Sequence, residues 1–262
     1  MFEARTRAAR ALLQIVVTVL TIPFVFPLVA MVQGSFAGTG WNNYRAVFEI
    51  RALPLFFRNS ALIASSVILV VYACTMLAAF GFSKLHIRAR ETYFWLLLAA
   101  LTLPEVVLLT PLFATATTLG FYDTYLAVVL PLAALQIPFT VLLARNFMDG
   151  IPNELIEAAR IDGATMARTF RSIVLPLTRP IAAAIIVLTL ITAWNDYLLP
   201  LVFLQNPDLQ PVTLVPQFFV SQFNNDQTKV LAAAVVTAIP EVIAYLGLQR
   251  LFERGLSAGA LK

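Results

Sequence analysis

Four polar side chains that can bind a solute or an ion lie inside apolar stretches of this sequence. Glu105, Asp196 and Glu241 carry carboxylates next to or near a proline, and Asn195 adds an amide beside Asp196. Such groups form hydrogen bonds with hydroxyl-rich solutes, and carboxylates also bind protons or sodium ions. Because a carboxylate in the middle of a bilayer costs about 2.5 kcal/mol or more on insertion scales, we expect these side chains to face a bundle interior or an aqueous path.

Glu105, Asn195 and Asp196 are therefore candidates for lining a solute path. A packing or kink role is an equal alternative for Asn195 and Asp196. Glu105 and Glu241 have two further alternatives: their side chains could reach the outer surface of the membrane, or they could form polar contacts with a partner chain. Prolines occur in five of the six long apolar runs, and they allow bends that suit a gated path without proving one.

Residue patterns that perform catalysis are missing. The sequence has no G-x-x-x-x-G-K-[S/T] motif and none of its three lysines follows a glycine, so it cannot hold nucleotide phosphates in that way. It also has no G-x-S-x-G motif and no His/Cys group at metal-ligand spacing. The single histidine, His86, fits a solvated loop, and the single cysteine, Cys74, fits a small packed residue. We predict no catalytic residue, no metal and no cofactor in this chain.

The longest polar interruption, residues 148–176, lies between two apolar runs of membrane-spanning length. Pro152 suits the first turn of a short helix, because a proline there loses no helical hydrogen bond. Gly163 lies where that helix would end on a left-handed residue. Thr165 can cap a second short helix, which we expect to end at Pro176. The sequence therefore predicts a compact helix–turn–helix held between two membrane helices.

The bulk composition places the chain in a bilayer. Of its 262 residues 60% are hydrophobic and 12% are charged, whereas a soluble domain has about 25% charged residues. A helix needs about 20 residues to cross an apolar core of about 30 Å. We predict an all-α membrane protein, a single domain over residues 1–262 with six spans at about 11–32, 60–82, 93–115, 124–147, 180–204 and 230–252. A cleaved signal peptide is the rival interpretation of the first run, but that run is longer than a signal core.

The distribution of cations predicts the orientation. With six spans, all but four of the 18 lysine and arginine residues fall on the side that holds both termini and residues 148–176. The positive-inside rule places that side in the cytoplasm. Because the cations are spread over loops and not gathered on an aromatic face, the partner is a lipid bilayer and not nucleic acid. The four exceptions are Arg45, Arg51, Arg58 and Lys229.

The polar interruption carries a known pattern. Glu157-Ala158-Ala159, then Gly163 after three residues, then Ile173, Leu175 and Pro176 after nine more, resembles the EAA loop of membrane subunits of binding-protein-dependent ABC importers. The resemblance covers essentially the whole chain. Within this family the sequence is similar to the carbohydrate-importer branch, in particular to the maltose-permease G type. Further segments that carry it are Asn42-Asn43-Tyr44-Arg45, Asn59-Ser60, Ile151-Pro152, Ala193-Trp194-Asn195-Asp196, Gln249-Arg250 and residues 255–262.

The resemblance implies the type I ABC importer permease fold, with six transmembrane helices and a cytoplasmic coupling helix in residues 148–176, hereafter the EAA loop. In this family the coupling helix docks in a cleft of an ATPase subunit, and ATP-driven closing of the ATPase pair switches the permease from inward- to outward-facing. The residues that the resemblance assigns to ATPase coupling are Leu155, Glu157, Ala158, Ala159, Asp162 and Gly163.

Roles within that set follow from the same resemblance. Glu157 is the acid that reaches basic or polar groups on the ATPase. Ala158 and Ala159 allow close approach of the partner. Gly163 fixes the angle between the two short helices.

The resemblance also implies the partners. They are a second homologous permease subunit, two cytoplasmic ATPase subunits that hold ATP and Mg, and an extracytoplasmic solute-binding protein that touches the loop 205–229. The complex is expected in the bacterial cytoplasmic membrane, with a sugar or a sugar-like solute such as a glycerol-phosphate diester as cargo.

Two other functions compete with this interpretation. An ion-coupled secondary transporter would use Glu105, Asp196 and Glu241 as proton or sodium sites, and such transporters often have two matching halves. Internal repetition is not evident here, because only the EAA loop forms a polar helical insertion of this kind. A membrane scaffold or membrane enzyme is the other class, and the lack of a catalytic constellation opposes the enzyme.

Overall fold

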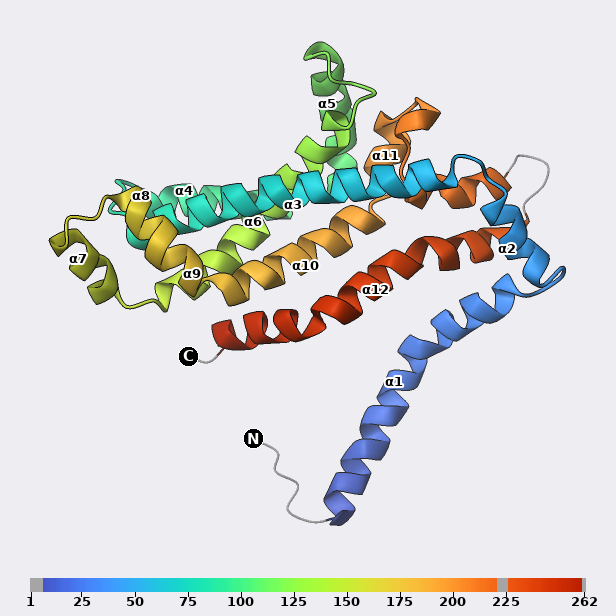
Figure 1. Ribbon diagram of the computed structural model, residues 1–262, viewed down its shortest axis with the longest axis horizontal. Helices are drawn as coiled ribbons and strands as arrows, with labels where there is room; N and C mark the ends of the chain where they lie inside the picture. The colour runs from blue at the N-terminus through green and yellow to red at the C-terminus, as the bar shows by residue number, and fades with distance from the viewer. Residues whose placement is uncertain (1–6, 221–225, 261–262) are drawn as a thin grey trace. The chain divides into compact units, whose positions relative to one another are not determined.

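The computed structural model describes residues 7–220 and 226–260, and the long regular elements there are helices (Figure 1). The all-α class expected from the sequence is confirmed. The ends of the expected domain, residues 1–6 and 261–262, and part of its second large loop, residues 221–225, lie outside the described residues. The long helices are α1 (Arg7–Ser35), α3 (Leu53–Lys84), α6 (Leu126–Asp149), α10 (Arg179–Asn195) and α12 (Gln227–Ala260).

Shorter elements connect the long helices. They are α2 (Trp41–Phe48), α4 (Arg90–Ala99), η1 (Ala100–Thr102), α5 (Glu105–Thr118), α7 (Asn153–Ile161), α8 (Met166–Thr169), the π-helix η2 (Phe170–Val174), α9 (Leu175–Leu177), α11 (Leu198–Phe203), η3 (Pro207–Leu209) and η4 (Val212–Phe219).

Four helices of the described ranges are long and apolar enough to cross a bilayer: Ala9–Ser35, Leu53–Lys84, Leu126–Asp149 and Gln227–Arg250. Two bent pairs also qualify by length and composition, Arg90–Thr102 with Glu105–Thr118 and Met166–Leu177 with Arg179–Asn195. If each bent pair forms one span, the number rises to six, which equals the number of apolar runs in the sequence.

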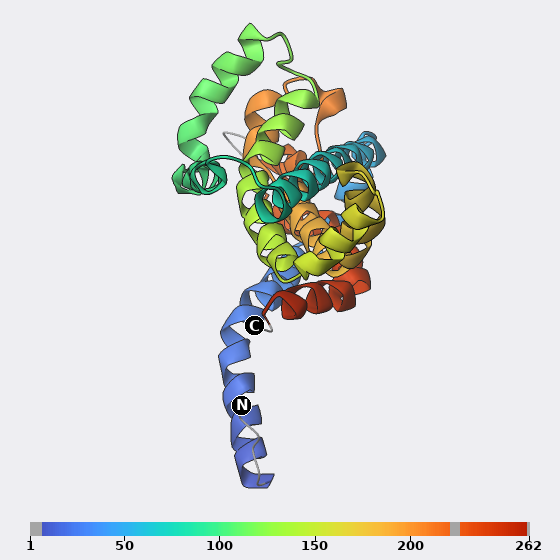
Figure 2. The same ribbon diagram turned by 90° about the vertical axis from the view of Figure 1, so that its left-hand side faces the viewer.

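The third apolar run, expected as one helix over about 93–115, is divided. Leu103 and Pro104 are extended, with ψ of 118° and 134°, and the helical segments on either side differ in direction by 103° (Figure 2). A residue before proline is driven out of the helical region by a clash with the proline ring. The break therefore follows from the Leu103-Pro104 pair, and it places Glu105 in the first turn of α5, where the helix dipole favours a carboxylate.

The fifth run, expected as one helix over about 180–204, is divided as well. α10 ends at Asn195, Asp196 is extended with ψ of 125°, and the chain becomes helical again in α11. The amide of Asn195 donates to the carbonyl of Ile191, one turn earlier in α10, at 3.0 Å. Asn195 and Asp196 therefore lie at a helix end and not inside a helix.

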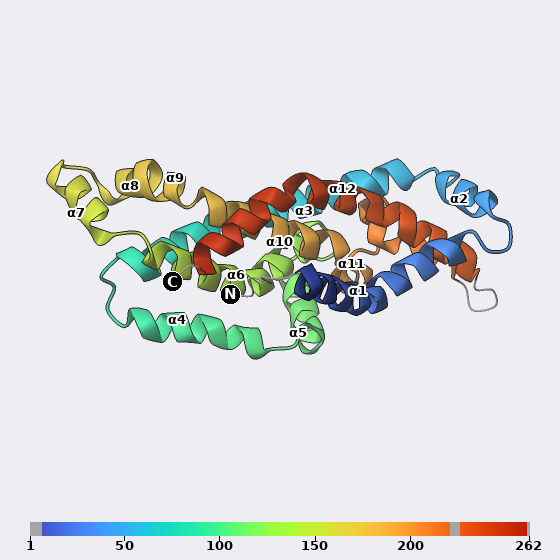
Figure 3. The same ribbon diagram turned by 90° about the horizontal axis from the view of Figure 1, so that it is seen from below.

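The chain divides into two compact units, Met1–Leu53 with Val215–Ile239 and Pro54–Leu214 with Pro240–Lys262. In the larger unit α6 is central, because it contacts α4, α5, α10 and α11. Small buried residues on α6, such as Ala133 and Ala144, let neighbouring helix backbones come close. Thr75 of α3 and Thr140 of α6 share a buried 2.6 Å hydrogen bond. In this unit α3, α6 and α10 run side by side (Figures 1 and 3).

In the smaller unit, Asn43 fixes the turn between α1 and α2. Asn43 is 1% exposed, and its Nδ2 donates to the carbonyls of Ser35 and Ala37, at 2.9 Å each. Its Oδ1 accepts hydrogen bonds from the hydroxyls of Thr39 and Thr228. This one amide therefore ties the end of α1 to the start of α12.

In the larger unit, Asn59 fixes the segment that follows α11. Asn59 is fully buried, and its Nδ2 donates to the carbonyls of Asp208 at 2.8 Å and Gln210 at 2.9 Å. Its Oδ1 accepts from the hydroxyl of Tyr125 at 2.8 Å. These bonds join residues about 150 positions apart in the sequence, so residues 208–210 are held firmly on the first part of α3.

Asn59→Ala is expected to lower the melting temperature of the purified transporter. Two carbonyl groups and one tyrosine hydroxyl lose their hydrogen-bond partner, and each of these part-buried hydrogen bonds contributes about 0.5–1.5 kcal/mol. Differential scanning fluorimetry measures the change. Asn42→Ala is the matched control, because Asn42 is exposed; equal melting temperatures for the two variants would contradict the role of Asn59.

Candidate functional site

The first half of the EAA loop folds into the short amphipathic helix α7. Pro152 precedes it in an extended conformation, and Glu154 in its first turn favours the positive end of the helix dipole. Ile156 and Ala159 form its buried face, with 4% and 6% exposure. The helix α7 lies at the tip of the larger unit, beyond the ends of α3 and α6 (Figures 1 and 3).

Most residues that the sequence assigned to ATPase coupling are exposed. Ala159 is the exception, because it is buried within this chain. Its small side chain therefore allows close packing with the chain's own residues and not with a partner. Apolar side chains are also exposed at this tip, Leu155 at 43% and Ile161 at 86%. An exposed apolar surface with a charged rim is typical of a protein contact. The exposed coupling residues are Leu155, Glu157, Ala158, Asp162 and Gly163.

Gly163 ends α7 in the left-handed conformation that the sequence predicted. Its φ is +77°, the N–H of Ala164 donates to the carbonyl of Ala159 at 2.9 Å, and its own N–H donates to the carbonyl of Arg160 at 3.0 Å. These two bonds form a Schellman motif. A Cβ at position 163 would meet no atom within 4 Å, so the positive φ, and not a lack of space, requires glycine.

The second half of the EAA loop departs from the expectation at its end. Thr165 caps α8 as predicted, accepting from the N–H of Arg168 at 3.3 Å. The helical path continues through η2 and α9 to Leu177, one residue beyond the expected end at Pro176, and bends by 76° before α10. Pro176 lies in the first turn of α9, where a missing N–H is tolerated.

Lys84 ties α7 to the end of α3. Only 7% of Lys84 is exposed, and its Nζ donates to the carbonyl of Ile151 at 2.6 Å and to Oδ1 of Asn153 at 2.9 Å. Hydrogen bonds from charged groups contribute about 1.5–3 kcal/mol. In the sequence, Lys84 looks like one more loop cation; the signal for its anchoring role is a lysine in the last turn of a long apolar helix, close to a polar loop.

A second polar contact joins the end of α6 to α3 and α4. Nη2 of Arg145 lies 2.6 Å from Oε1 of Glu91, its Nε lies 3.7 Å from Oδ2 of Asp149, and its guanidinium lies 3.9 Å from the centre of the Phe94 ring. Asp149 also accepts from the hydroxyl of Ser83 at 2.6 Å. The EAA loop therefore rests on a base built by three helices.

Two of the polar residues inside the apolar runs meet at the end of α10. Nδ2 of Asn195 donates to Oε1 of Glu241 at 2.6 Å. Glu105 Oε1 and Asp196 Oδ2 are buried and have no hydrogen-bond partner in the described part of the chain. Both oxygens can therefore accept a hydrogen bond from a bound hydroxyl group.

The described residues offer no cluster of three or more His, Cys, Asp or Glu side chains that would hold a metal ion. The geometry provides two features: an exposed helix anchored to the ends of two bilayer-length helices, and two unpaired carboxyl oxygens, one where α5 begins and one where α10 ends.

Comparisons with known proteins agree with these features. The family described as "Binding-protein-dependent transport system inner membrane component" matches residues 3–258. The melibiose/raffinose/stachyose import permease protein MelC of Bacillus subtilis (strain 168) is 33% identical over 229 residues, which make up 86% of this chain and 82% of MelC.

Two solved structures share the fold. A bacterial ABC transporter involved in the import of the acidic polysaccharide alginate has a TM-score of 0.78 at 20% identity, over 96% of this chain and 99% of that chain. The bacterial alginate ABC transporter in complex with alginate pentasaccharide-bound periplasmic protein has a TM-score of 0.73 at 14% identity, over 94% and 93%. The family resemblance read from the EAA loop is confirmed, and the chain belongs to the inner-membrane components of binding-protein-dependent transport systems.

Proposed function

We propose that this chain is one permease half of an ATP-driven importer for a sugar or sugar-like solute, and that its EAA loop transmits the motion of an ATPase to the membrane helices. The observation that carries the proposal is the exposed helix α7, which Lys84 holds on the end of α3 and which follows α6 directly in the chain. A rigid body attached in this way tilts its helices when a partner displaces it. MelC is named for oligosaccharide import and the structural neighbours for alginate import, which supports a carbohydrate cargo.

The partners follow from the family. A second, homologous permease subunit completes the pore, and two cytoplasmic ATPase subunits bind α7 and hold ATP and Mg. An extracytoplasmic solute-binding protein delivers the cargo to the loop 205–229. The clamp that Asn59 places on residues 208–210 supports a firm docking surface there. The distribution of cations supports an orientation with both termini and the EAA loop in the cytoplasm.

The solute path passes the end of α10. Glu105 and Asp196 offer buried carboxyl oxygens without a partner, and Asn195 adds an exposed amide. A sugar hydroxyl donates to a carboxylate oxygen or to the amide oxygen of Asn195, so this group of side chains suits a hydroxyl-rich cargo.

ATP dependence tests the proposal. The whole complex, with both permease subunits and both ATPase subunits, is reconstituted in proteoliposomes with its solute-binding protein outside, and a thermal-shift screen of that protein identifies the sugar. We expect labelled sugar to accumulate only with ATP inside the vesicles and to be unaffected by ionophores. Uptake that needs no ATP and stops when an ion gradient is collapsed would contradict the proposal and favour ion coupling through Glu105, Asp196 and Glu241.

A further inference from the structure

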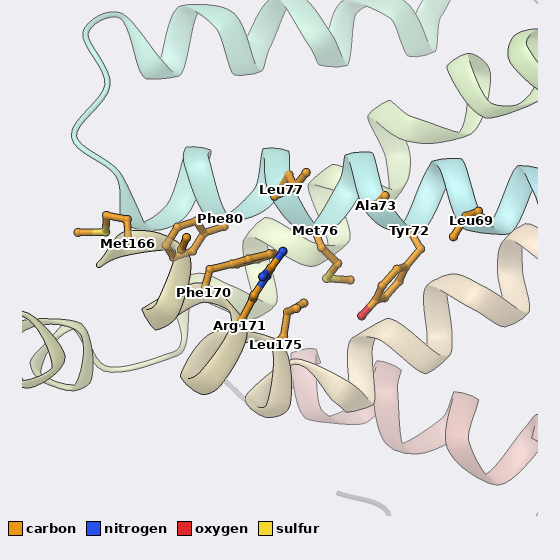
Figure 4. Close-up of a pocket in the computed structure, with 11 residues that line it drawn as sticks. Leu69, Tyr72, Ala73, Met76, Leu77, Phe80, Met166, Phe170, Arg171 and Leu175 are labelled. Carbon is orange, nitrogen blue, oxygen red and sulfur yellow. The ribbon is translucent and has the colours of Figure 1, made fainter. Parts of the chain in front are cut away.

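A groove of about 520 Å³ runs along α3 on the side that faces α8, η2 and α9 (Figure 4). All of its lining lies within the larger unit. Its lining includes Leu69, Ala73, Met76, Phe80, Phe170 and Arg171.

The wall of the groove suits a flexible apolar chain. Met76 and Phe80 form its floor, with 1% and 6% exposure, and the rings of Phe80 and Phe170 lie 5.0 Å apart. Leu69 and Leu77 are 69% and 59% exposed, so the groove is open to its surroundings. Methionine side chains adapt to irregular apolar ligands because they are unbranched and flexible.

The depth of the groove matches one leaflet of a bilayer. Phe80 lies one turn before the end of α3, and Leu69 lies eleven residues deeper, which is about 16 Å at 1.5 Å per residue. Half of an apolar core of about 30 Å is about 15 Å. A ligand that enters from the α7 end of α3 therefore reaches about as far as the middle of the membrane.

The charged residue in the lining is Arg171. Figure 4 shows its side chain extending over the groove toward α3. Arg171 is exposed, and the described part of the chain gives it no ion-pair or hydrogen-bond partner. A guanidinium beside an apolar groove complements a ligand with an anionic head and a long apolar tail.

We propose that this groove binds an anionic phospholipid of the cytoplasmic leaflet, with an acyl chain along α3 and the phosphate on Arg171. This assignment rests on the orientation in the proposed function, which places the EAA loop in the cytoplasm. Cations at the cytoplasmic ends of membrane helices attract anionic lipid headgroups. The lipid would contact α3 and the second half of the EAA loop at once, and so it links the lipid composition of the membrane to the coupling element.

Native mass spectrometry of the purified complex after incubation with phosphatidylglycerol tests the assignment. Arg171→Gln removes the cation, and Ala73→Trp fills the groove while keeping the cation. We expect each to reduce the retained phosphatidylglycerol at least fivefold. Arg168→Gln is the matched control, because Arg168 is an exposed arginine of the same loop that does not line the groove; it should retain the lipid as the unchanged complex does.

Three outcomes would overturn the proposal: full lipid retention by Arg171→Gln, equal displacement of the lipid by inorganic phosphate alone, or loss of the companion permease subunit from Ala73→Trp with the bound lipid unchanged. The last would make the groove a protein interface. Lipid retention needs neither ATP nor sugar, so ATP-driven uptake measured on the same preparation separates a failure of this inference from a failure of the proposed function.

Discussion

Glu157→Lys is expected to abolish ATP-driven uptake and to release the ATPase subunits, while the chain still inserts in the membrane. Glu157 is exposed on α7 with no salt bridge in the described chain, so its carboxylate is free for a partner. Disrupting one member of a buried charge pair at an interface costs about 2–5 kcal/mol, which is a factor of about 30 to several thousand in affinity. Uptake in proteoliposomes and co-purification of the ATPase subunits measure the two effects.

Glu154→Lys is the matched control for Glu157→Lys. Glu154 is also exposed on α7 and lies in its first turn, where a positive charge opposes the helix dipole more strongly than at position 157. If destabilisation of α7 caused the loss, Glu154→Lys would show at least the same loss. We expect it to keep most of the uptake. Glu157→Gln keeps the size of the side chain without the charge and should give an intermediate result; wild-type uptake in Glu157→Lys would refute the coupling role.

Local patterns in the sequence determined much of this fold and of the EAA loop. Proline at position 152 and glycine at position 163 set the ends of α7 through backbone rules that need no tertiary contact. Thr165 capped its helix for the same reason. The apolar runs marked the long helices because a bilayer demands length and hydrophobicity and little else.

Features that depend on distant contacts were not predictable in this way. Ala159 was expected to face a partner, but α7 turns that side toward the chain itself, and only tertiary packing decides which face is buried. Glu105 and Asp196 lie at the ends of helices, and not inside them, only because two runs, each expected to be one straight helix, are broken.

The anchoring role of Lys84 also depends on contacts that the sequence does not show, and it leads to a prediction that differs from the one for Glu157. Lys84→Met should lower uptake about tenfold or more and yet leave the ATPase subunits bound, because the exposed face of α7 is unchanged while its anchor to α3 is lost. Two hydrogen bonds from the ammonium group disappear, and the carbonyl of Ile151 loses a partner. A loss of about 1.5–3 kcal/mol at this joint corresponds to a factor of about 10 to 150 in the population of the anchored state.

Two further variants separate this anchoring role from a general loss of stability. Lys84→Arg keeps a cationic donor of similar reach and should recover part of the uptake. Arg88→Met removes another cation of the loop that follows α3; Arg88 is exposed and lies outside the coupling residues, so this variant should leave uptake unchanged. In the Lys84→Met complex, ATP hydrolysis should continue without matching sugar transport, because the ATPase then displaces α7 without displacing α3. Full transport in that variant, or loss of the ATPase subunits from it, would show that α7 needs no anchor beyond its covalent link to α6.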